Sequence, residues 1–269
     1  MTGHMKSRAR LDVAVAGGGV VGAACALALA RAGLDVALVE ARPVPRWLAE
    51  QPDLRVYALA PDNAALLDAL GVWPQVVRAR AQPYRKMRVW DAGGGDELAF
   101  DAATLARDEL GWIVENGLLV DRLWAALVAA GVQVHCPARV QGMEQDEAGV
   151  RLQLDDGTRL EARLAVAADG GASELRRLAG LDVDAHDYGQ RGVVAFIETA
   201  DPHQETAWQR FLPTGPLALL PFTQGRSSIV WTLPEAEAQR VLALDDAAFA
   251  LELTDASAAR LGRAQPVSE

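Results

Sequence analysis

Residues 12–40, DVAVAGGGVVGAACALALARAGLDVALVE, decide how this chain folds. The small and β-branched residues from Asp12 to Ala16 are typical of a buried strand, and the alanine- and leucine-rich run from Val20 to Ala32 is typical of a helix. Residues Asp35 to Glu40 again favour a strand. A strand, a helix and a second strand in this order predict a βαβ unit with parallel strands, and therefore an α/β fold.

The turn between the first strand and the helix is rich in glycine. Gly17, Gly19 and Gly22 satisfy the pattern G-x-G-x-x-G. In this place the first glycine permits a tight turn, the second lets a pyrophosphate approach the backbone, and the third allows the helix to pack closely on the strand. Glu40 ends the second strand, where a carboxylate accepts hydrogen bonds from a ribose and repels a 2′-phosphate. The unit is therefore predicted to bind a dinucleotide, and the pattern alone does not choose between NAD and FAD.

A second strand-to-helix turn carries a related signal. The apolar residues Leu164 to Ala168 favour a strand that runs directly into Asp169 and Gly170. Ser173 is a suitable N-cap for the helix that follows. We therefore expect Asp169 at the C-terminal edge of the sheet, where open α/β sheets bind their ligands.

The composition excludes several classes of protein. The chain has 269 residues, of which 51% are hydrophobic and 23% charged, so it can bury a large core and does not resemble a disordered chain. Its net charge of −10 opposes binding to nucleic acid. The longest apolar run, Val20 to Ala30, is too short to cross a bilayer. Two cysteines and four scattered histidines predict neither a disulfide framework nor a metal site, and we expect a cytoplasmic protein.

The rest of the chain continues the alternation of helices and strands and then changes. Residues Leu59 to Leu70 and Leu118 to Ala130 favour helices, each followed by a glycine. Beyond Asp182 four strand-like segments follow one another, which predicts a separate, mostly antiparallel sheet. Helical sequence returns over Pro234 to Leu253. Residues 1–10 are polar and resemble an expression tag or a disordered N-terminus, so they are left out of the expected fold.

Residues Asp169 to Arg176, DGGASELR, resemble the D-G-A-x-S-x-V-R motif of the flavin-dependent aromatic-ring hydroxylases. Gly171 stands where that motif usually has Ala, and Leu175 stands where it has Val. Further stretches resemble the ubiquinone-pathway hydroxylases of the UbiH/UbiF/VisC type. They are residues 51–55 (QPDLR), 70–73 (LGVW), 111–116 (GWIVEN), 207–211 (AWQRF) and 215–221 (GPLALLP).

This resemblance implies two interleaved domains. A Rossmann-like FAD-binding domain of the aromatic hydroxylase type would comprise residues 11–75 and 111–182. A substrate domain with a mostly antiparallel β-sheet would comprise residues 76–110 and 183–262. FAD would be the cofactor and NADPH or NADH the co-substrate. The implied cofactor-binding residues are Gly17, Gly19, Gly22, Glu40, Arg55, Asp169 and Gly170, with Arg55 at the FAD pyrophosphate.

The implied activity is FAD-dependent hydroxylation of the ring of a prenylated phenol or quinol in ubiquinone biosynthesis, with NAD(P)H and O₂. Because the cofactor carries the chemistry, we assign no catalytic side chain. Phe211, Leu219, Pro221 and Trp231 are the candidates for the substrate pocket, the alternative being that they only form the core of the sheet. The prenyl tail implies peripheral contact with the inner membrane or with other proteins of the ubiquinone pathway.

Two departures from the family pattern lead to further expectations. The family usually has a polar residue such as Gln or His at the position of Val120, near the flavin phosphates. Its third motif, G-D-A-A-H, is expected beyond Gly262 and does not occur. We therefore expect a C-terminally truncated member that is inactive by itself and binds FAD weakly or not at all. Two alternatives stay open, a non-catalytic partner or scaffold with the FAD fold and an NAD-dependent dehydrogenase.

Overall fold

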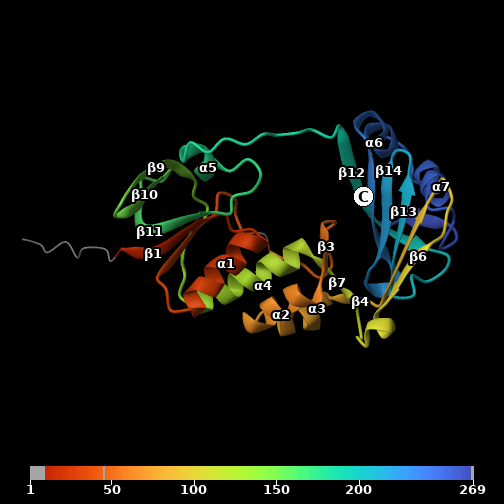
Figure 1. Cartoon of the computed structure of the whole chain (residues 1–269), viewed down its shortest axis with the longest axis horizontal. Coiled ribbons are helices and arrows are strands. Elements are labelled where there is room, and N and C mark those ends of the chain that lie inside the picture. The colour runs from red at the N-terminus through yellow and green to blue at the C-terminus, as the bar shows by residue number, and fades with distance from the viewer. Residues whose placement is uncertain (1–9, 45, 268–269) are drawn as a thin grey trace, which may run out of the picture. The chain divides into compact units, whose positions relative to one another are not determined.

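The computed structural model describes residues 10–44 and 46–267 (Figure 1). The expected tag or disordered N-terminus lies outside the described residues, apart from Arg10. The chain forms two compact units that alternate along the sequence. The first unit comprises residues 1–47, 66–75 and 117–184, and the second comprises residues 48–65, 76–116 and 185–269.

The first unit is built on a six-stranded sheet with the strand order β8-β2-β1-β11-β10-β9. The first four strands of this order are parallel, and the last two are antiparallel to their neighbours. Almost every residue of the two central strands β1 and β2 is buried, as is usual for parallel strands covered on both faces. The strands are β1 (Leu11–Ala16), β2 (Val36–Val39), β8 (Gln133–His135), β9 (Val140–Asp146), β10 (Gly149–Leu154) and β11 (Arg159–Ala167).

Helices connect the strands of the first unit. The predicted βαβ unit is confirmed, because β1 and β2 are parallel neighbours joined by a helix. In helix α4 (Asn116–Ala129), the leucines at positions 119, 123 and 127 are buried, and their spacing of four places them on one helical face. The α-helices that precede residue 190 are α1 (Val20–Arg31), α2 (Pro61–Ala69), α3 (Trp73–Arg80), α4 (Asn116–Ala129) and α5 (Glu174–Leu178).

The second unit contains two sheets. The smaller one has the antiparallel order β3-β7-β4, with β3 (Val56–Leu59), β7 (Gly111–Glu115) and β4 (Gln82–Tyr84). The larger one has the order β16-β12-β15-β14-β13-β5-β6, and only its β13–β5 pair is parallel. The expected mostly antiparallel sheet is therefore confirmed. Its strands are β5 (Lys86–Asp91), β6 (Leu98–Asp101), β12 (Gln190–Thr199), β13 (Thr206–Leu212), β14 (Gly215–Pro221), β15 (Ser227–Pro234) and β16 (Ala264–Pro266).

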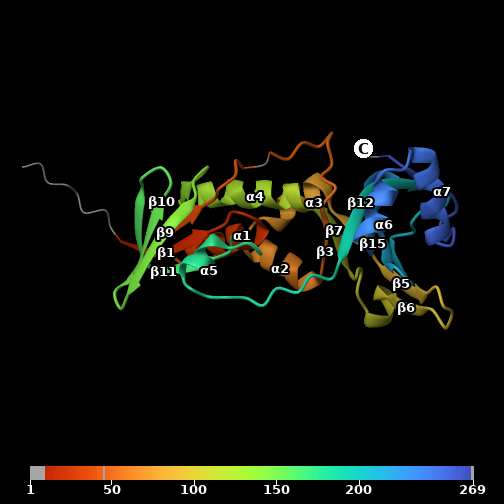
Figure 2. The same cartoon turned by 90° about the horizontal axis from the view of Figure 1, so that it is seen from above.

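Two helices cover one face of the seven-stranded sheet, α6 (Glu235–Leu242) and α7 (Asp246–Ala256) (Figure 2). Their buried side chains pack in one hydrophobic core with alternate residues of β12, β14 and β15. The sequence predicted one helical segment over Pro234–Leu253, and the structure divides it. Asp245 ends the connection between the helices, because its carboxylate accepts a hydrogen bond from Ala248 N at 2.8 Å and caps α7.

The helix expected over Leu59–Leu70 begins later than predicted. Residues up to Leu59 form β3, which pairs with β7, and α2 begins at Pro61. Proline is favoured in the first turn of a helix because its missing N–H would have no partner within the helix there. Leu59, where the expected helix begins, therefore belongs to a strand, although its spacing from the later leucines predicted a helix.

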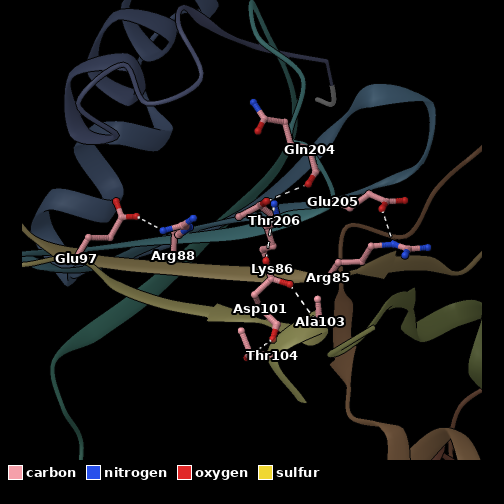
Figure 3. A network of polar contacts seen from close by, with 10 residues as sticks. All are labelled: Arg85, Lys86, Arg88, Glu97, Asp101, Ala103, Thr104, Gln204, Glu205 and Thr206. Atoms are coloured by element: carbon pink, nitrogen blue, oxygen red, sulfur yellow. Dashed lines mark hydrogen bonds and ion pairs between the residues drawn. The ribbon is translucent and has the colours of Figure 1, made fainter. Parts of the chain in front are cut away.

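A network of polar contacts joins the β5–β6 hairpin to β13, although more than a hundred residues separate them in sequence (Figure 3). Arg85 forms an ion pair with Glu205 at 2.7 Å, and Arg88 forms one with Glu97 at 3.1 Å. Asp101 accepts a hydrogen bond from Ala103 N at 3.0 Å and caps a short 3₁₀ helix. The parallel pairing of β5 with β13 makes this segment from the middle of the chain part of the C-terminal sheet, and the Arg85–Glu205 ion pair lies at the start of that pairing.

Candidate functional site

The glycine loop, residues 17–22, comprises the turn between β1 and α1 and the first residues of α1, and its glycines are required for different reasons. Gly17 has a φ of +102°, and a Cβ atom there would lie 2.2 Å from the carbonyl oxygen of Ala168. A Cβ atom at Gly22 would lie 1.9 Å from the carbonyl oxygen of Gly17. The Cβ position of Gly19, in contrast, has no atom within 4 Å. The loop is thus packed tightly on its inner side and open at Gly19.

The N-terminus of α1 lies at this open side. Gly19 is the N-cap, and the first turn that follows it contains no acidic residue. The backbone N–H groups of a first turn have no partner within their helix and carry partial positive charge. This end of the helix is therefore suited to an anion such as a pyrophosphate.

Glu40 follows β2 and holds the loop through its carboxylate. Its Oε2 accepts a hydrogen bond from Gly18 N at 2.6 Å, and its Oε1 accepts one from Arg42 N at 2.8 Å. The Glu40 side chain is 12% exposed. A carboxylate has about four acceptor sites, so the remaining ones are available for ribose hydroxyls.

Asp169 follows β11 and has one engaged and one unengaged carboxylate oxygen. Its Oδ2 accepts a hydrogen bond from Leu175 N at 3.1 Å, whereas its Oδ1 is buried without a hydrogen-bond partner among the described residues. A buried acceptor of this kind costs free energy unless a ligand or water satisfies it. Ser173 caps α5 as predicted, since its hydroxyl accepts a hydrogen bond from Arg176 N at 3.0 Å.

Five of the predicted cofactor-binding residues line one groove of about 730 Å³ in the first unit. They are Gly17, Gly19, Glu40, Asp169 and Gly170. Gly170 has a φ of +89° and open space at its Cβ position, as Gly19 does. Open glycines, a helix N-terminus, a carboxylate with spare acceptor sites and an unpaired carboxylate oxygen together fit a dinucleotide.

The other two predicted cofactor residues lie outside this groove. Gly22 lies on the inner side of the loop, against Gly17 and Ala168, where it allows α1 to approach β1. Arg55 belongs to the second unit, where its side chain is exposed and its carbonyl oxygen accepts a hydrogen bond from Asn116 N at 2.9 Å. Its contact with a pyrophosphate stays a prediction.

The structure also identifies groove residues that the sequence did not single out. Arg42 and Arg139 both line the groove. Behind the loop, the Nε1 atom of Trp124 donates a hydrogen bond to the carbonyl oxygen of Gly18 at 2.7 Å. In the sequence Trp124 has the helical spacing of an ordinary core residue, and only tertiary structure brings it to the loop. Val120, where the family pattern has a polar residue, is 3% exposed, so its side chain faces the interior.

Cys136 lies close to Glu40, and its environment keeps it protonated. Burial raises the pKa of the Cys136 thiol and outweighs a hydrogen bond with the Val44 backbone, which lowers it; the negative charge of Glu40 raises it further. The thiol donates a hydrogen bond to the carbonyl oxygen of Arg42 at 3.2 Å. A protonated thiol is a poor nucleophile, so Cys136 is suited to a structural role at neutral pH.

The four candidates for the substrate pocket are not brought together by the structure. Leu219 and Trp231 are 1% and 5% exposed and lie in the core beneath α6 and α7. Phe211 is 43% exposed on the opposite face of the same sheet, because it is out of phase with Leu219 in the β13–β14 register. Pro221 is buried at the end of β14. Alternation of side chains across a sheet therefore separates Phe211 from Leu219 and Trp231.

Within residues 10–44 and 46–267, no three His, Cys, Asp or Glu side chains are grouped so that they could hold a metal ion. In the same part of the chain, no helix is both long enough and apolar enough to span a membrane.

Comparison with known proteins agrees with the assignment of the groove to a dinucleotide. The chain is 34% identical over 259 residues to 3-demethoxyubiquinol 3-hydroxylase of Escherichia coli (strain K12), covering 96% of this chain and 66% of that protein. It is 36% identical to ubiquinone hydroxylase UbiL of Rhodospirillum rubrum, covering 95% of this chain and 59% of UbiL. It is 34% identical to human mitochondrial ubiquinone biosynthesis monooxygenase COQ6, covering 88% and 54%. The expected resemblance to ubiquinone-pathway hydroxylases is confirmed, and the chain spans between about half and two thirds of these relatives.

Solved structures confirm the predicted fold class. PqsL of Pseudomonas aeruginosa, described as a probable FAD-dependent monooxygenase, superimposes with a TM-score of 0.75 at 24% identity over 96% of this chain and 73% of PqsL. The p-nitrophenol 4-monooxygenase PnpA of Pseudomonas putida gives a TM-score of 0.70 at 24% identity, covering 87% and 61%. The model of the FAD binding domain family matches residues 10–265. This chain therefore belongs to the FAD binding domain family, and FAD is its cofactor.

Proposed function

We propose that the protein containing this chain is an FAD-dependent monooxygenase. It hydroxylates the ring of a prenylated phenol or quinol in ubiquinone biosynthesis and consumes NAD(P)H and O₂. One observation carries the proposal: relatives named as ubiquinone-pathway hydroxylases or monooxygenases align with 88–96% of this chain at 34–36% identity.

In this proposal the first unit binds FAD and the second contributes to the substrate site. Gly19 and the first-turn amides of α1 bind the pyrophosphate, and Glu40 accepts hydrogen bonds from the ribose. The Oδ1 atom of Asp169 accepts a hydrogen bond from the cofactor, which satisfies the buried oxygen. Arg55 is assigned to the pyrophosphate from the family resemblance. When bound, FAD supplies the transfer of electrons from NAD(P)H and the activation of O₂.

The face of the seven-stranded sheet opposite α6 and α7 is the part of the second unit that we assign to the substrate, at its Phe211 end. Elsewhere on this face Phe196 and Ala207 are buried against Tyr84 and Ile113 of the smaller sheet. Phe211 lies on this face with a 43% exposed ring. Leu219 and Trp231 support that face from the helix-covered side of the sheet. Because the substrate carries a prenyl tail, we also propose that the protein makes peripheral contact with a membrane or with other proteins of the pathway.

The test uses the complete gene product that contains this chain. The purified protein is supplied with NADPH or NADH and a short-chain prenylphenol under ¹⁸O₂. We expect a yellow protein, oxidation of the nicotinamide that depends on the phenol, and one ¹⁸O atom in the product by mass spectrometry. A colourless protein would contradict the cofactor assignment. Bound flavin without phenol-dependent oxidation would contradict the hydroxylase and favour a non-catalytic flavoprotein.

A further inference from the structure

Gly18 is the middle glycine of the loop, at a position that the pattern G-x-G-x-x-G leaves variable, and its peptide groups are held from two sides. Its N–H donates a hydrogen bond to Glu40 Oε2 at 2.6 Å. Its carbonyl oxygen accepts one from Trp124 Nε1 at 2.7 Å. All three residues belong to the first unit. Trp124 is 6% exposed, so this contact is shielded from competing water.

The same two residues leave no space for a side chain at Gly18. A Cβ atom there would lie 2.4 Å from Cζ2 of Trp124 and 3.0 Å from Cβ of Glu40. Gly17 needs glycine also for its φ of +102°, whereas at Gly18 the obstacle is the space taken by neighbouring side chains. In this chain the indole therefore restricts the variable position of the pattern to glycine.

The hydrogen bond from Trp124 also determines the direction of the next amide. The carbonyl of Gly18 and the N–H of Gly19 belong to one planar trans peptide, so they point in opposite directions. Trp124 binds this carbonyl on the side of α4. The Gly19 N–H must then point away from α4, and Gly19 lines the open groove.

We propose that Trp124 is a positioning residue for the cofactor loop. Together with Glu40 it fixes the Gly18 peptide before FAD arrives, so that the Gly19 amide and the first turn of α1 already face the pyrophosphate. A site arranged in this way avoids the cost of ordering the loop during binding. The inference rests on the proposed assignment of residues 17–22 to the FAD pyrophosphate.

The main test replaces Trp124 by Phe, which keeps a ring and removes the N–H donor. Trp208 offers a matched control in the second unit, because its Nε1 donates to the carbonyl oxygen of His203 at 3.3 Å. We expect Trp124→Phe to weaken FAD binding about ten-fold, in line with the loss of one buried hydrogen bond. Trp208→Phe should leave the FAD affinity unchanged. FAD affinity is measured by flavin fluorescence, and thermal unfolding of each apoprotein is recorded beside it.

Two further measurements separate positioning from general stability. In the apoprotein, hydrogen exchange of a peptide covering residues 17–22 should be faster in Trp124→Phe than in the wild type, and unchanged in Trp208→Phe. Gly18→Ala should also weaken FAD binding. In the background of Trp124→Leu, which vacates the space of the indole, Gly18→Ala should cause a much smaller further loss.

The outcomes distinguish this inference from the assignment on which it rests. If Glu40→Arg weakens FAD binding and Trp124→Phe does not, the positioning role is wrong and the loop assignment stands. Equal losses of affinity in Trp124→Phe and Trp208→Phe that follow their melting temperatures would also overturn the positioning role. If Gly19→Val, Glu40→Arg and Trp124→Phe all bind FAD like the wild type, or if the wild type binds none, the loop assignment fails and the inference with it.

Discussion

Arg80 and Glu115 form a buried ion pair, with Arg80 Nη1 3.1 Å from Glu115 Oε2 and side-chain exposures of 13% and 0%. Glu115 Oε1 also accepts a hydrogen bond from Asp53 N at 3.0 Å, and Arg80 donates to the carbonyl oxygen of Ala49. The pair thus fastens the segment before β3 to the end of β7. This segment continues into Arg55, the residue assigned to the FAD pyrophosphate.

Replacing Glu115 by Ala should destabilise the protein by about 3–5 kcal/mol, because it leaves the charge of Arg80 buried without this partner. Urea unfolding of the apoprotein measures the loss. Glu144→Gln is the control, since it removes an ion pair with Arg151 whose side chains are 77% and 51% exposed. Such surface pairs contribute little, so the control should unfold like the wild type. Equal behaviour of the two variants would contradict the anchoring role of Glu115.

Substitutions at two glycines of the loop should have different effects, one on stability and the other on cofactor binding. Gly22→Ala places a Cβ atom 1.9 Å from the carbonyl oxygen of Gly17, so we expect a clear fall in the melting temperature. Gly19→Val points into open space, so we expect a melting temperature close to that of the wild type and a loss of FAD affinity. Thermal unfolding and FAD titration of both variants check this. A Gly19→Val variant that binds FAD normally would show that the groove is not the pyrophosphate site.

His203 should make the stability of the second unit depend on pH. Its Nδ1 accepts a hydrogen bond from Glu205 N at 3.0 Å, and its Nε2 lies 3.1 Å from the carbonyl oxygen of Phe222, an arrangement that suits the neutral ring. Burial lowers the pKa of His203 from its ordinary value of 6.5, although the hydrogen bond to Phe222 and the charge of Glu205 act in the opposite direction. The unfolded chain therefore binds more protons around and below pH 6.5.

The contribution of His203 should be fully present above pH 6.5 and should decrease as the pH falls through 6.5 towards the lower pKa of the folded state. The experiment compares the wild type with His203→Asn, which does not titrate, by thermal unfolding at about pH 7.5 and about pH 5.5. The wild type should exceed the variant by more at the higher pH. A difference that is constant or larger at the lower pH would contradict the assigned neutral ring.

The two faces of the seven-stranded sheet should respond differently to truncation. Leu219→Ala removes a buried side chain from the core beneath α6 and α7, and we expect a loss of about 2–5 kcal/mol. Phe211→Ala acts on a 43% exposed ring of the opposite face, so its cost should be about 1 kcal/mol or less. Urea unfolding gives both values. In the complete gene product, Phe211→Ala should raise the KM for the prenylphenol, and an unchanged KM would remove Phe211 from the substrate site.

Much of the fold could be predicted because local patterns determine it. The buried strands β1 and β2 and the glycine loop between them lie within residues 12–40, so no long-range contact is needed to recognise the βαβ unit. The turn at Asp169 was predicted for the same reason, with Ser173 as its cap. From these two segments, Gly17, Gly19, Glu40, Asp169 and Gly170 line the groove.

The remaining features depend on contacts that no local pattern contains. Residues 215–221, GPLALLP, are apolar throughout, so their sequence does not show which face of β14 is buried. The register with β13 decides this, by placing Leu219 opposite Trp208 and Pro216 opposite Phe211. Trp124 likewise reaches Gly18 from 106 residues away.

The central claim is that residues 17–22 together with Glu40 and Asp169 form the FAD site of this chain. Titration of the complete gene product that contains this chain with FAD, followed by flavin fluorescence, tests it most directly when the same titration is made with Glu40→Arg. We expect saturable binding of FAD by the wild type and an affinity at least about ten-fold weaker in the variant, because a cation replaces the ribose acceptor and the brace of the loop. Equal affinities of the two proteins, or no binding by the wild type, would contradict the account.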